Sequence, residues 1–372
     1  MTDTRIATAE RRETRRPGDQ RLSIIDSDVH PTVVTIGEMR PYLSKRWWSY
    51  LNSYGPRPKH GFAQGDPYPK AAPRAARRDA WTPEGKFPGS DLDYMRQHYL
   101  DAYDVEYGIL SPLQPTGQGD SNPEFSEVMC RAINDWQRDK WTRPEQRLKA
   151  SIVIPYEDAA ASVAEIERCA DDRDFSQILL FARTSEPIGS RRYWPILEKA
   201  VEVGLPVAMH VFGYGGHAGT GGGWPSYYLE EMTSHATACQ AGIVSLAMNG
   251  VFERFPGLKV IMIEGGFGWL ASLMWRLDTQ WARHREEVPH VTRPPSESLR
   301  QGLWISTQPM EEPERARHLL DVMEWIGWDR LLIATDYPHW DFDDPSQALP
   351  RSLDLEKRLA ICSGNARAVY RL

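Results

Sequence analysis

In the segment Leu331-Leu332-Ile333-Ala334-Thr335-Asp336-Tyr337-Pro338-His339, an apolar run of strand length ends in a carboxylate and then a Tyr-Pro turn. The same arrangement occurs at Leu22–His30, where apolar residues lead into Asp28-x-His30, and at Leu205–His210. The carboxyl ends of the strands in a parallel barrel open onto one face, and that face carries the chemistry. The pattern therefore predicts a site assembled from strand ends that are far apart in the sequence.

Eight short apolar runs lie along the chain, each with little polar alternation, as expected of parallel strands that are covered on both faces. They are Leu22–Asp26, Tyr107–Ser111, Lys149–Ile154, Ser176–Phe181, Pro206–His210, Lys259–Ile263, Leu303–Thr307 and Leu331–Thr335. Helical patterns lie between most of them, at Asn122–Trp141, Ala159–Cys169, Tyr193–Val203, Met232–Val251, Phe267–His284 and Glu314–Trp325. This alternation predicts an α/β fold, a distorted (β/α)8 TIM barrel, with a doubly wound open sheet as the alternative.

The composition is that of an ordinary globular protein. The 372 residues are 41% hydrophobic and 26% charged, and the net charge of −7 disfavours nucleic acid as a partner. No apolar run approaches the roughly 18 residues of a membrane span. The four cysteines are scattered without a C-x-x-C pair, which favours free thiols in a reducing cytoplasm over a cysteine-type zinc site.

Two segments differ from the barrel pattern. Residues 1–20 are rich in Arg, without the apolar stretch of a secretory signal, and are predicted to be a disordered tail before a barrel at 21–372. Residues 39–90 form a long insertion after the first strand, rich in Pro, Gly and aromatic residues and poor in helical periodicity. An insertion of this length is usually functional or disordered, so it is predicted to be a lid; a peripheral excursion or a subunit contact is the alternative.

The candidate metal ligands are Asp28, His30, His210 and Asp336. Residues i and i+2 of an extended strand point to the same side, so Asp28 and His30 can hold one cation together. Each residue alone has an ordinary explanation, as a capping Asp or a core His, but their recurrence at three strand ends favours a metal. Two His and two Asp suit zinc, manganese or iron, and leave a position for water or substrate.

Further candidates for chemistry lie beside these ligands. Glu264 ends the sixth apolar run and can be a general acid or base, a further ligand, or a structural carboxylate that holds Arg276. His235 opens the helix after a glycine-rich loop and is a catalytic candidate, with a helix-face His as the alternative. Arg183, just past the fourth run, and Arg57 in the insertion are candidates for binding a substrate carboxylate. Trp224 suits a planar substrate.

The ordered motifs resemble the amidohydrolase superfamily. They are Asp28-x-His30, His210, Glu264-Gly265-Gly266 and Thr335–His339. More narrowly, the chain resembles the amidohydrolase-related branch that includes aminocarboxymuconate-semialdehyde decarboxylase and resorcylate-type decarboxylases, to which Gly250–Lys259 and Gly364–Arg367 are also similar. The resemblance covers nearly the whole chain from Leu22, except the insertion. It implies a barrel with one divalent metal held by the four candidate ligands, with Asp336 able to exchange protons, and a homodimer.

The chain departs from that branch in two places. The fourth run leads into Arg183 and offers no Lys to be carbamylated and bridge two metals, which favours a single ion, zinc first and manganese next. Decarboxylases of the branch have a His after strand six, where this chain has Glu264. Glu264 or His235 would therefore have to perform the acid–base work of that His.

Three functions are compatible with these residues. The favoured one is a metal-dependent decarboxylase, a carbon–carbon lyase, that acts on a small aromatic or unsaturated carboxylic acid. The alternative enzyme is a hydrolase of a lactone, ester or amide that uses metal-activated water, with a hydratase as a near variant. A non-catalytic metal-binding scaffold is disfavoured, because every expected ligand position holds a competent residue.

Overall fold

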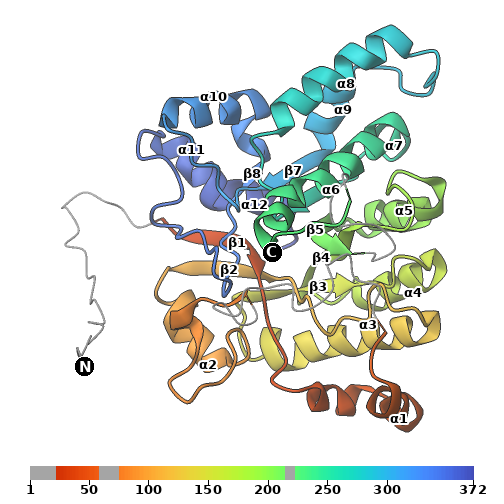
Figure 1. Ribbon diagram of the computed structural model, residues 1–372, viewed down its shortest axis with the longest axis vertical. Coiled ribbons are helices and arrows are strands. Elements are labelled where there is room, and N and C mark those ends of the chain that lie inside the picture. Colours follow the sequence, from red (N-terminus) through yellow and green to blue (C-terminus); the bar gives the residue numbers. More distant parts are fainter. Residues whose placement is uncertain (1–21, 58–74, 214–222) are drawn as a thin grey trace.

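The computed structural model describes residues 22–57, 75–213 and 223–372. The predicted tail at 1–20 and the middle of the insertion lie outside these ranges. Eight parallel strands follow one another in sequence order around a nearly closed barrel, and helices surround it (Figure 1). The predicted (β/α)8 TIM barrel is confirmed.

All eight predicted runs contain strands, although some ends differ. The strands are β1 (Ile24–Val29), β2 (Val105–Leu110), β3 (Leu148–Val153), β4 (Phe175–Arg183), β5 (Val207–Gly213), β6 (Val260–Ile263), β7 (Leu303–Ser306) and β8 (Leu331–Leu332). β1 continues beyond Asp28, and β5 continues beyond His210. β8 is shorter than predicted because the backbone of Ile333 leaves β7: its N–H donates to Ile361, and its carbonyl accepts from Ser27.

Each of the six predicted helical segments contains a helix, and the remaining helices were not predicted. The helices are α1 (Lys45–Tyr54), α2 (Leu92–Met95), α3 (Pro123–Gln137), α4 (Ala159–Cys169), α5 (Trp194–Val203), α6 (Tyr228–Met248), α7 (Val251–Arg254), α8 (Leu270–His284), α9 (Pro295–Gly302), α10 (Ala316–Ile326), α11 (Leu355–Leu359) and α12 (Asn365–Val369). Asn122 caps α3, with its side chain accepting from the N–H of Phe125.

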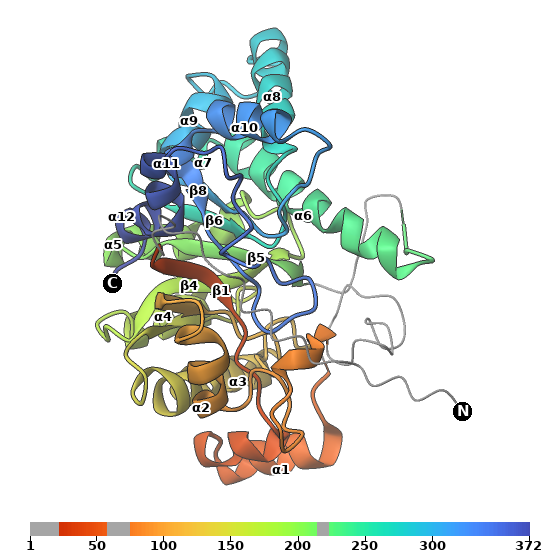
Figure 2. The same ribbon diagram turned by 90° about the vertical axis from the view of Figure 1, so that its left-hand side faces the viewer.

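The first difference concerns α6, which starts four residues earlier than Met232. Glu230 accepts from the N–H of Tyr227 at 2.8 Å and caps the helix there. His235 consequently lies inside the helix and does not open it, and the amino-terminal part of α6 projects away from the barrel (Figure 2). The second difference is α1, which forms inside the insertion although the sequence there is poor in helical periodicity. Ser44 caps α1 by accepting from Trp47 N–H at 3.4 Å, and Leu51 is its one buried residue.

The seam between β1 and β8 is the irregular part of the barrel. No ladder joins the two strands; the backbone contacts are Ser27 N to Ile333 O at 3.0 Å, His30 N to Tyr337 O at 2.8 Å, and a single bridge between Val29 and Tyr337. Side chains therefore have to supply part of the connection across the seam.

The end of the insertion contacts the turn that follows β8. Ala76 forms an antiparallel bridge with His339, and the N–H of Arg77 donates to Pro338 O at 3.0 Å. The N–H of Trp340 donates to Ala75 O at 2.5 Å. Residues 75–77 thus lie on the carboxyl-end side of the barrel, and the role of the insertion as a lid stays a prediction.

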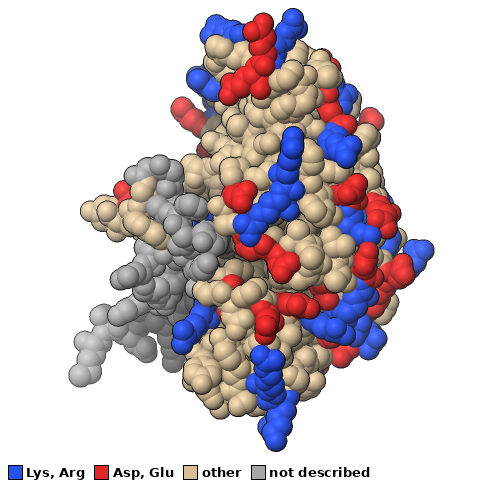
Figure 3. Space-filling model, turned by 90° about the vertical axis from the view of Figure 1, so that its right-hand side faces the viewer, with Lys and Arg blue, Asp and Glu red and all other residues tan. Residues whose placement is uncertain are grey.

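On the face drawn in Figure 3, acidic and basic side chains are interspersed. Among the described helices, none is long and apolar enough to cross a membrane.

Candidate metal centre

Five buried side chains converge at the carboxyl ends of the strands. Asp28 lies in β1, with His30 just after it; His210 lies in β5, Glu264 directly follows β6, and Asp336 follows β8. One ligand atom from each of Asp28, His30, His210 and Glu264 lies within 4.8 Å of all the others. The structure therefore brings together the four predicted ligands and Glu264.

The backbone is strained at two of these residues. Glu264 has φ of 60° and Asp336 has φ of 61°, in the left-handed region that non-glycine residues rarely occupy. Such conformations cost on the order of 1–3 kcal/mol each and cluster at functional sites. At Glu264 the backbone N–H donates to Ser306 Oγ at 3.1 Å, which helps to hold this conformation.

Backbone carbonyls orient both imidazoles. His30 Nδ1 lies 2.7 Å from Ser111 O, and His210 Nδ1 lies 2.9 Å from Val211 O. A carbonyl oxygen can only accept, so Nδ1 carries the hydrogen in both rings. In the neutral rings, each Nε2 then has a lone pair that faces the cluster, as in a ligand prepared for a metal.

The atoms of the cluster are close together without hydrogen bonds. His30 Nε2 is 2.8 Å from Asp336 Oδ1 and 3.4 Å from Asp28 Oδ1, and His210 Nε2 is 2.8 Å from Glu264 Oε2. Both Nε2 atoms, both Asp28 oxygens and Glu264 Oε2 are buried and have no hydrogen-bond partner. Buried polar atoms of this kind require a partner. This imidazole and carboxylate donor set fits a divalent metal ion.

Three residues surround Asp336. His339 Nδ1 lies 2.6 Å from Asp336 Oδ1, and Gln308 Nε2 lies 3.3 Å from Asp336 Oδ2. Burial, followed by the charges of Asp336 and Glu264, raises the pKa of Asp341 to about 9. Gln308 and Asp341 were not predicted from the sequence, although Gln308 lies two residues past β7, at the carboxyl end of a strand, where functional residues are expected.

His235 and Arg183 lie beside the metal centre. The Phe212 ring contacts both His235 and His210, with centroid distances of 5.1 Å and 5.5 Å respectively. Burial, then the charge of Arg183, lowers the pKa of His235 to about 3, so its imidazole is neutral near pH 7. Arg183 ends β4 and is 8% exposed; burial lowers its pKa, which the charge of Glu231 partly offsets.

The other two predicted substrate-binding residues are exposed. The backbone N–H of Arg57 donates to Asp120 Oδ2 at 2.9 Å, and its side chain is exposed. Trp224 is 55% exposed. Both residues border segments outside the described ranges, and their roles in substrate binding stay predictions.

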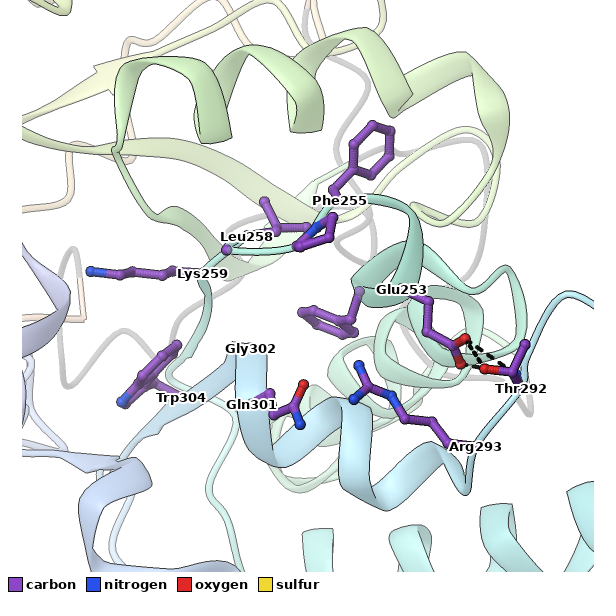
Figure 4. A pocket seen from close by; sticks show the side chains of 12 residues that line it. Glu253, Phe255, Leu258, Lys259, Thr292, Arg293, Gln301, Gly302 and Trp304 are labelled. Atoms are coloured by element: carbon purple, nitrogen blue, oxygen red, sulfur yellow. Dashed lines mark hydrogen bonds between the residues drawn. The ribbon is translucent and has the colours of Figure 1, made fainter.

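A separate cavity of about 460 Å³ lies at the opposite end of the barrel (Figure 4). Its lining includes Lys259 and Trp304, close to the starts of β6 and β7. The carboxylate of Glu253 there is already bonded to the N–H and the hydroxyl of Thr292. This cavity is therefore remote from the strand ends that carry the candidate metal ligands.

The comparisons with known proteins agree with this geometry. A family model described as Amidohydrolase matches residues 25–372. The chain belongs to the amidohydrolase family. This amidohydrolase is 25% identical over 301 residues to a gamma-resorcylate decarboxylase from Polaromonas sp. strain JS666, covering 76% of this chain and 88% of the relative. It is 22% identical over 247 residues to a 2-amino-3-carboxymuconate-6-semialdehyde decarboxylase from Dictyostelium discoideum, covering 66% of each chain.

A solved structure extends the likeness in fold. A 5-carboxyvanillate decarboxylase from Novosphingobium aromaticivorans, with bound manganese and 3-methoxy-4-hydroxy-5-nitrobenzoic acid, superposes on this amidohydrolase with a TM-score of 0.69. The match covers 94% of this chain and 97% of the other, at 17% identity. The predicted resemblance to the decarboxylase-containing branch of the amidohydrolases is confirmed.

Proposed function

We propose that the protein is a metal-dependent decarboxylase of a small aromatic or unsaturated carboxylic acid. The observation that carries the proposal is the convergence of two imidazole Nε2 atoms and three carboxylates, buried and without hydrogen-bond partners for most of their facing atoms, at the strand ends. Support for decarboxylation comes from the relatives that are decarboxylases of gamma-resorcylate and of 2-amino-3-carboxymuconate-6-semialdehyde; another relative is a hydratase.

The ligands of the metal are Asp28, His30, His210 and Asp336. We propose one ion per chain, zinc first and manganese next; the bound manganese of the structural neighbour supports the second choice. When bound, the ion supplies a Lewis acid that draws electron density from the substrate carboxylate and an adjacent oxygen.

The remaining residues bind the substrate and supply a proton. The guanidinium of Arg183 binds an anionic oxygen of the substrate, and the neutral ring of His235 is available as a hydrogen-bonding group beside it. Arg57 and Trp224 are proposed to contact the substrate from the surrounding loops. As the carbon–carbon bond breaks and CO2 leaves, the carbon that loses the carboxylate has to receive a proton.

Glu264 is the better donor of that proton, with Asp336 as the other candidate. Burial, then the charge of Asp336, raises the pKa of Glu264, which favours the protonated carboxyl that a proton donor needs. The imidazoles of His339 and His30 outweigh burial and lower the pKa of Asp336, which keeps that carboxylate ionised. Glu264 thus performs the work of the His that this branch has after strand six.

The first test is elemental analysis of protein purified without chelator, beside His210→Ala and Asp336→Asn. We expect one divalent ion per wild-type chain and less in both variants, together with CO2 release from hydroxylated benzoic acids by the wild type alone. Absence of metal, with no rise in thermal stability on adding zinc or manganese, would refute the proposal. Metal binding with hydrolysis of lactones, and no CO2 release, would identify the protein as a hydrolase.

We further propose a homodimer that acts in the cytoplasm. All four cysteines are buried and free, which supports a reducing compartment. Sedimentation equilibrium on the metal-loaded protein tests the oligomeric state, and a mass of one chain would contradict the dimer.

A further inference from the structure

Asp26 is a fully buried carboxylate that the proposed reaction does not use. It lies in β1, two residues before Asp28. Its Oδ1 accepts from the backbone N–H of Asp28 and of Thr335, each at 3.0 Å. Its Oδ2 accepts from the hydroxyl of Thr335 at 2.6 Å and from the hydroxyl of Tyr99. Four protein donors therefore occupy both oxygens, and Asp26 is not among the residues of the candidate metal cluster.

The four donors lie on both sides of the barrel seam. Thr335 immediately precedes Asp336 in the chain, and the N–H of Asp28 belongs to a ligand itself. The backbone of β1 meets that of the β8 segment at few points, because no ladder joins them. Two hydrogen bonds of Asp26 therefore cross the seam to Thr335, beside Asp336, and a third holds the backbone of Asp28 in its own strand.

Through Tyr99, a third element also forms a hydrogen bond with Asp26. Tyr99 belongs to the helical turn Arg96–Leu100, and its hydroxyl is also 3.0 Å from Thr335 Oγ1. Its ring stacks on Tyr337, with centroids 4.3 Å apart and planes within 9°. Asp336 is therefore held through both of its neighbours in the chain, which helps to explain how its strained backbone persists.

We propose that Asp26 is a positioning residue that sets the separation of Asp28 and Asp336 across the seam, and thereby the geometry of the metal. This inference rests on the proposed metal centre. Metal–ligand distances tolerate deviations of only about 0.2 Å, so a small shift at the seam changes the coordination. Residues that orient ligands typically change metal affinity by about 10–100-fold when they are replaced.

The test is cobalt(II) binding to metal-free protein, followed by visible absorption, because the d–d bands report ligand geometry. Asp26→Ala removes the acceptor for all four donors. We expect its cobalt affinity to fall by about 10–100-fold and its d–d bands to change in position or intensity. Asp26→Asn keeps the shape and one acceptor oxygen, and its amide can donate to the two hydroxyls, so we expect it to restore most of the wild-type spectrum.

Asn134→Ala is the matched control for a loss of stability alone. The Asn134 side chain is also fully buried and bonds both the N–H and the carbonyl of Val153, at 2.8 and 2.9 Å. Val153 ends β3, which carries none of the proposed ligands. We expect this variant to melt at a lower temperature with an unchanged cobalt spectrum.

Each result separates the positioning role from the proposed function. A wild-type protein that binds no cobalt, zinc or manganese overturns both proposals. A wild-type protein that binds cobalt, beside an Asp26→Ala variant with the same affinity and spectrum, overturns the positioning role alone. If Asp26→Ala does not fold, Tyr99→Phe takes its place. A cobalt spectrum and affinity equal to those of the wild type then overturn the positioning role. A change in the direction expected for Asp26→Ala, but smaller, supports it.

Discussion

The Oε2 atom of Glu264 lies 2.8 Å from the Nε2 atom of His210. His210 Nδ1 already contacts the carbonyl of Val211, so the neutral ring directs a lone pair, and no hydrogen, at the carboxylate. Two lone pairs at this separation require a proton or a cation between them. Glu264 is therefore either the proton donor of the reaction or a further metal ligand, and one substitution distinguishes these roles.

Glu264→Gln keeps the size of the side chain and removes its exchangeable proton. If Glu264 is the acid, we expect kcat for decarboxylation to fall by about 10²–10⁴-fold with the metal content unchanged. CO2 release and elemental analysis measure the two quantities. A parallel loss of metal would make Glu264 a ligand. Glu311→Gln is the control, because that carboxylate accepts from the N–H of Phe267 and of Gly268 and lies outside the cluster.

Arg183→Met tests substrate binding. The guanidinium is buried at the end of β4, and its replacement removes a planar donor for an anionic oxygen. We expect KM for the aromatic acid to rise about tenfold or more, which corresponds to about 1.4 kcal/mol, with metal content unchanged. Steady-state kinetics beside Arg57→Ala shows which arginine binds: a rise in KM confined to Arg57→Ala would contradict the assignment.

His235→Gln changes the response of stability to acid. The pKa of His235 is about 3 in the folded protein and about 6.5 in the unfolded chain. The contribution of the neutral ring to the free energy of unfolding is therefore complete above pH 6.5 and is lost as the pH falls towards 3. Between pH 7 and pH 5 we expect the unfolding free energy of the wild type to decrease by about 1–2 kcal/mol more than that of the variant. Urea titrations at both pH values measure this difference. The exposed His284→Gln should follow the wild type.

Asp343 affects stability with the opposite pH dependence to His235, and Asp343→Asn tests this. Burial, with a smaller effect of the Asp336 charge, raises the pKa of Asp343 to about 7, above the unfolded value of 3.8. Stability is therefore lost as the pH rises from 3.8 through 7. The Asn side chain can still accept from Met310 N–H, so we expect the variant to be about 1 kcal/mol more stable at pH 8 and close to the wild type at pH 4. Equal melting temperatures at pH 8 would contradict this, and the exposed Asp321→Asn is the control.

The barrel and the convergence of ligands were predictable from the sequence. Buried parallel strands leave a strong local signal, since each is a short apolar run, and a barrel places all strand ends on one face. Asp28, His30, His210, Glu264 and Asp336 were recognisable because each ends or closely follows such a run. The start of α6 was not predicted well, because it depends on a side-chain cap by Glu230.

The residues that support the ligands were not predictable in this way. Gln308 and Asp341 act through contacts with Asp336 that only the closed barrel creates. Asp26 resembles an isolated polar residue in a strand until Tyr99 and Thr335, which are 73 and 309 residues away in the sequence, are brought to it. Such partners depend on tertiary packing, for which short-range periodicity carries no signal.

The backbone hydrogen bonds of Arg77 and Trp340 couple the end of the insertion to the turn beside the candidate metal centre. Residues 75–77 pair with the backbone of Pro338–Trp340, shortly after the proposed metal ligand Asp336. Loss of these hydrogen bonds would therefore free the backbone on one side of Asp336. Amide hydrogen exchange at Arg77 and Trp340 should slow when a ligand is bound, since tightening the turn suppresses local opening. Substitutions in the insertion that only change its opening equilibrium will then change ligand affinity, although they touch neither metal nor substrate.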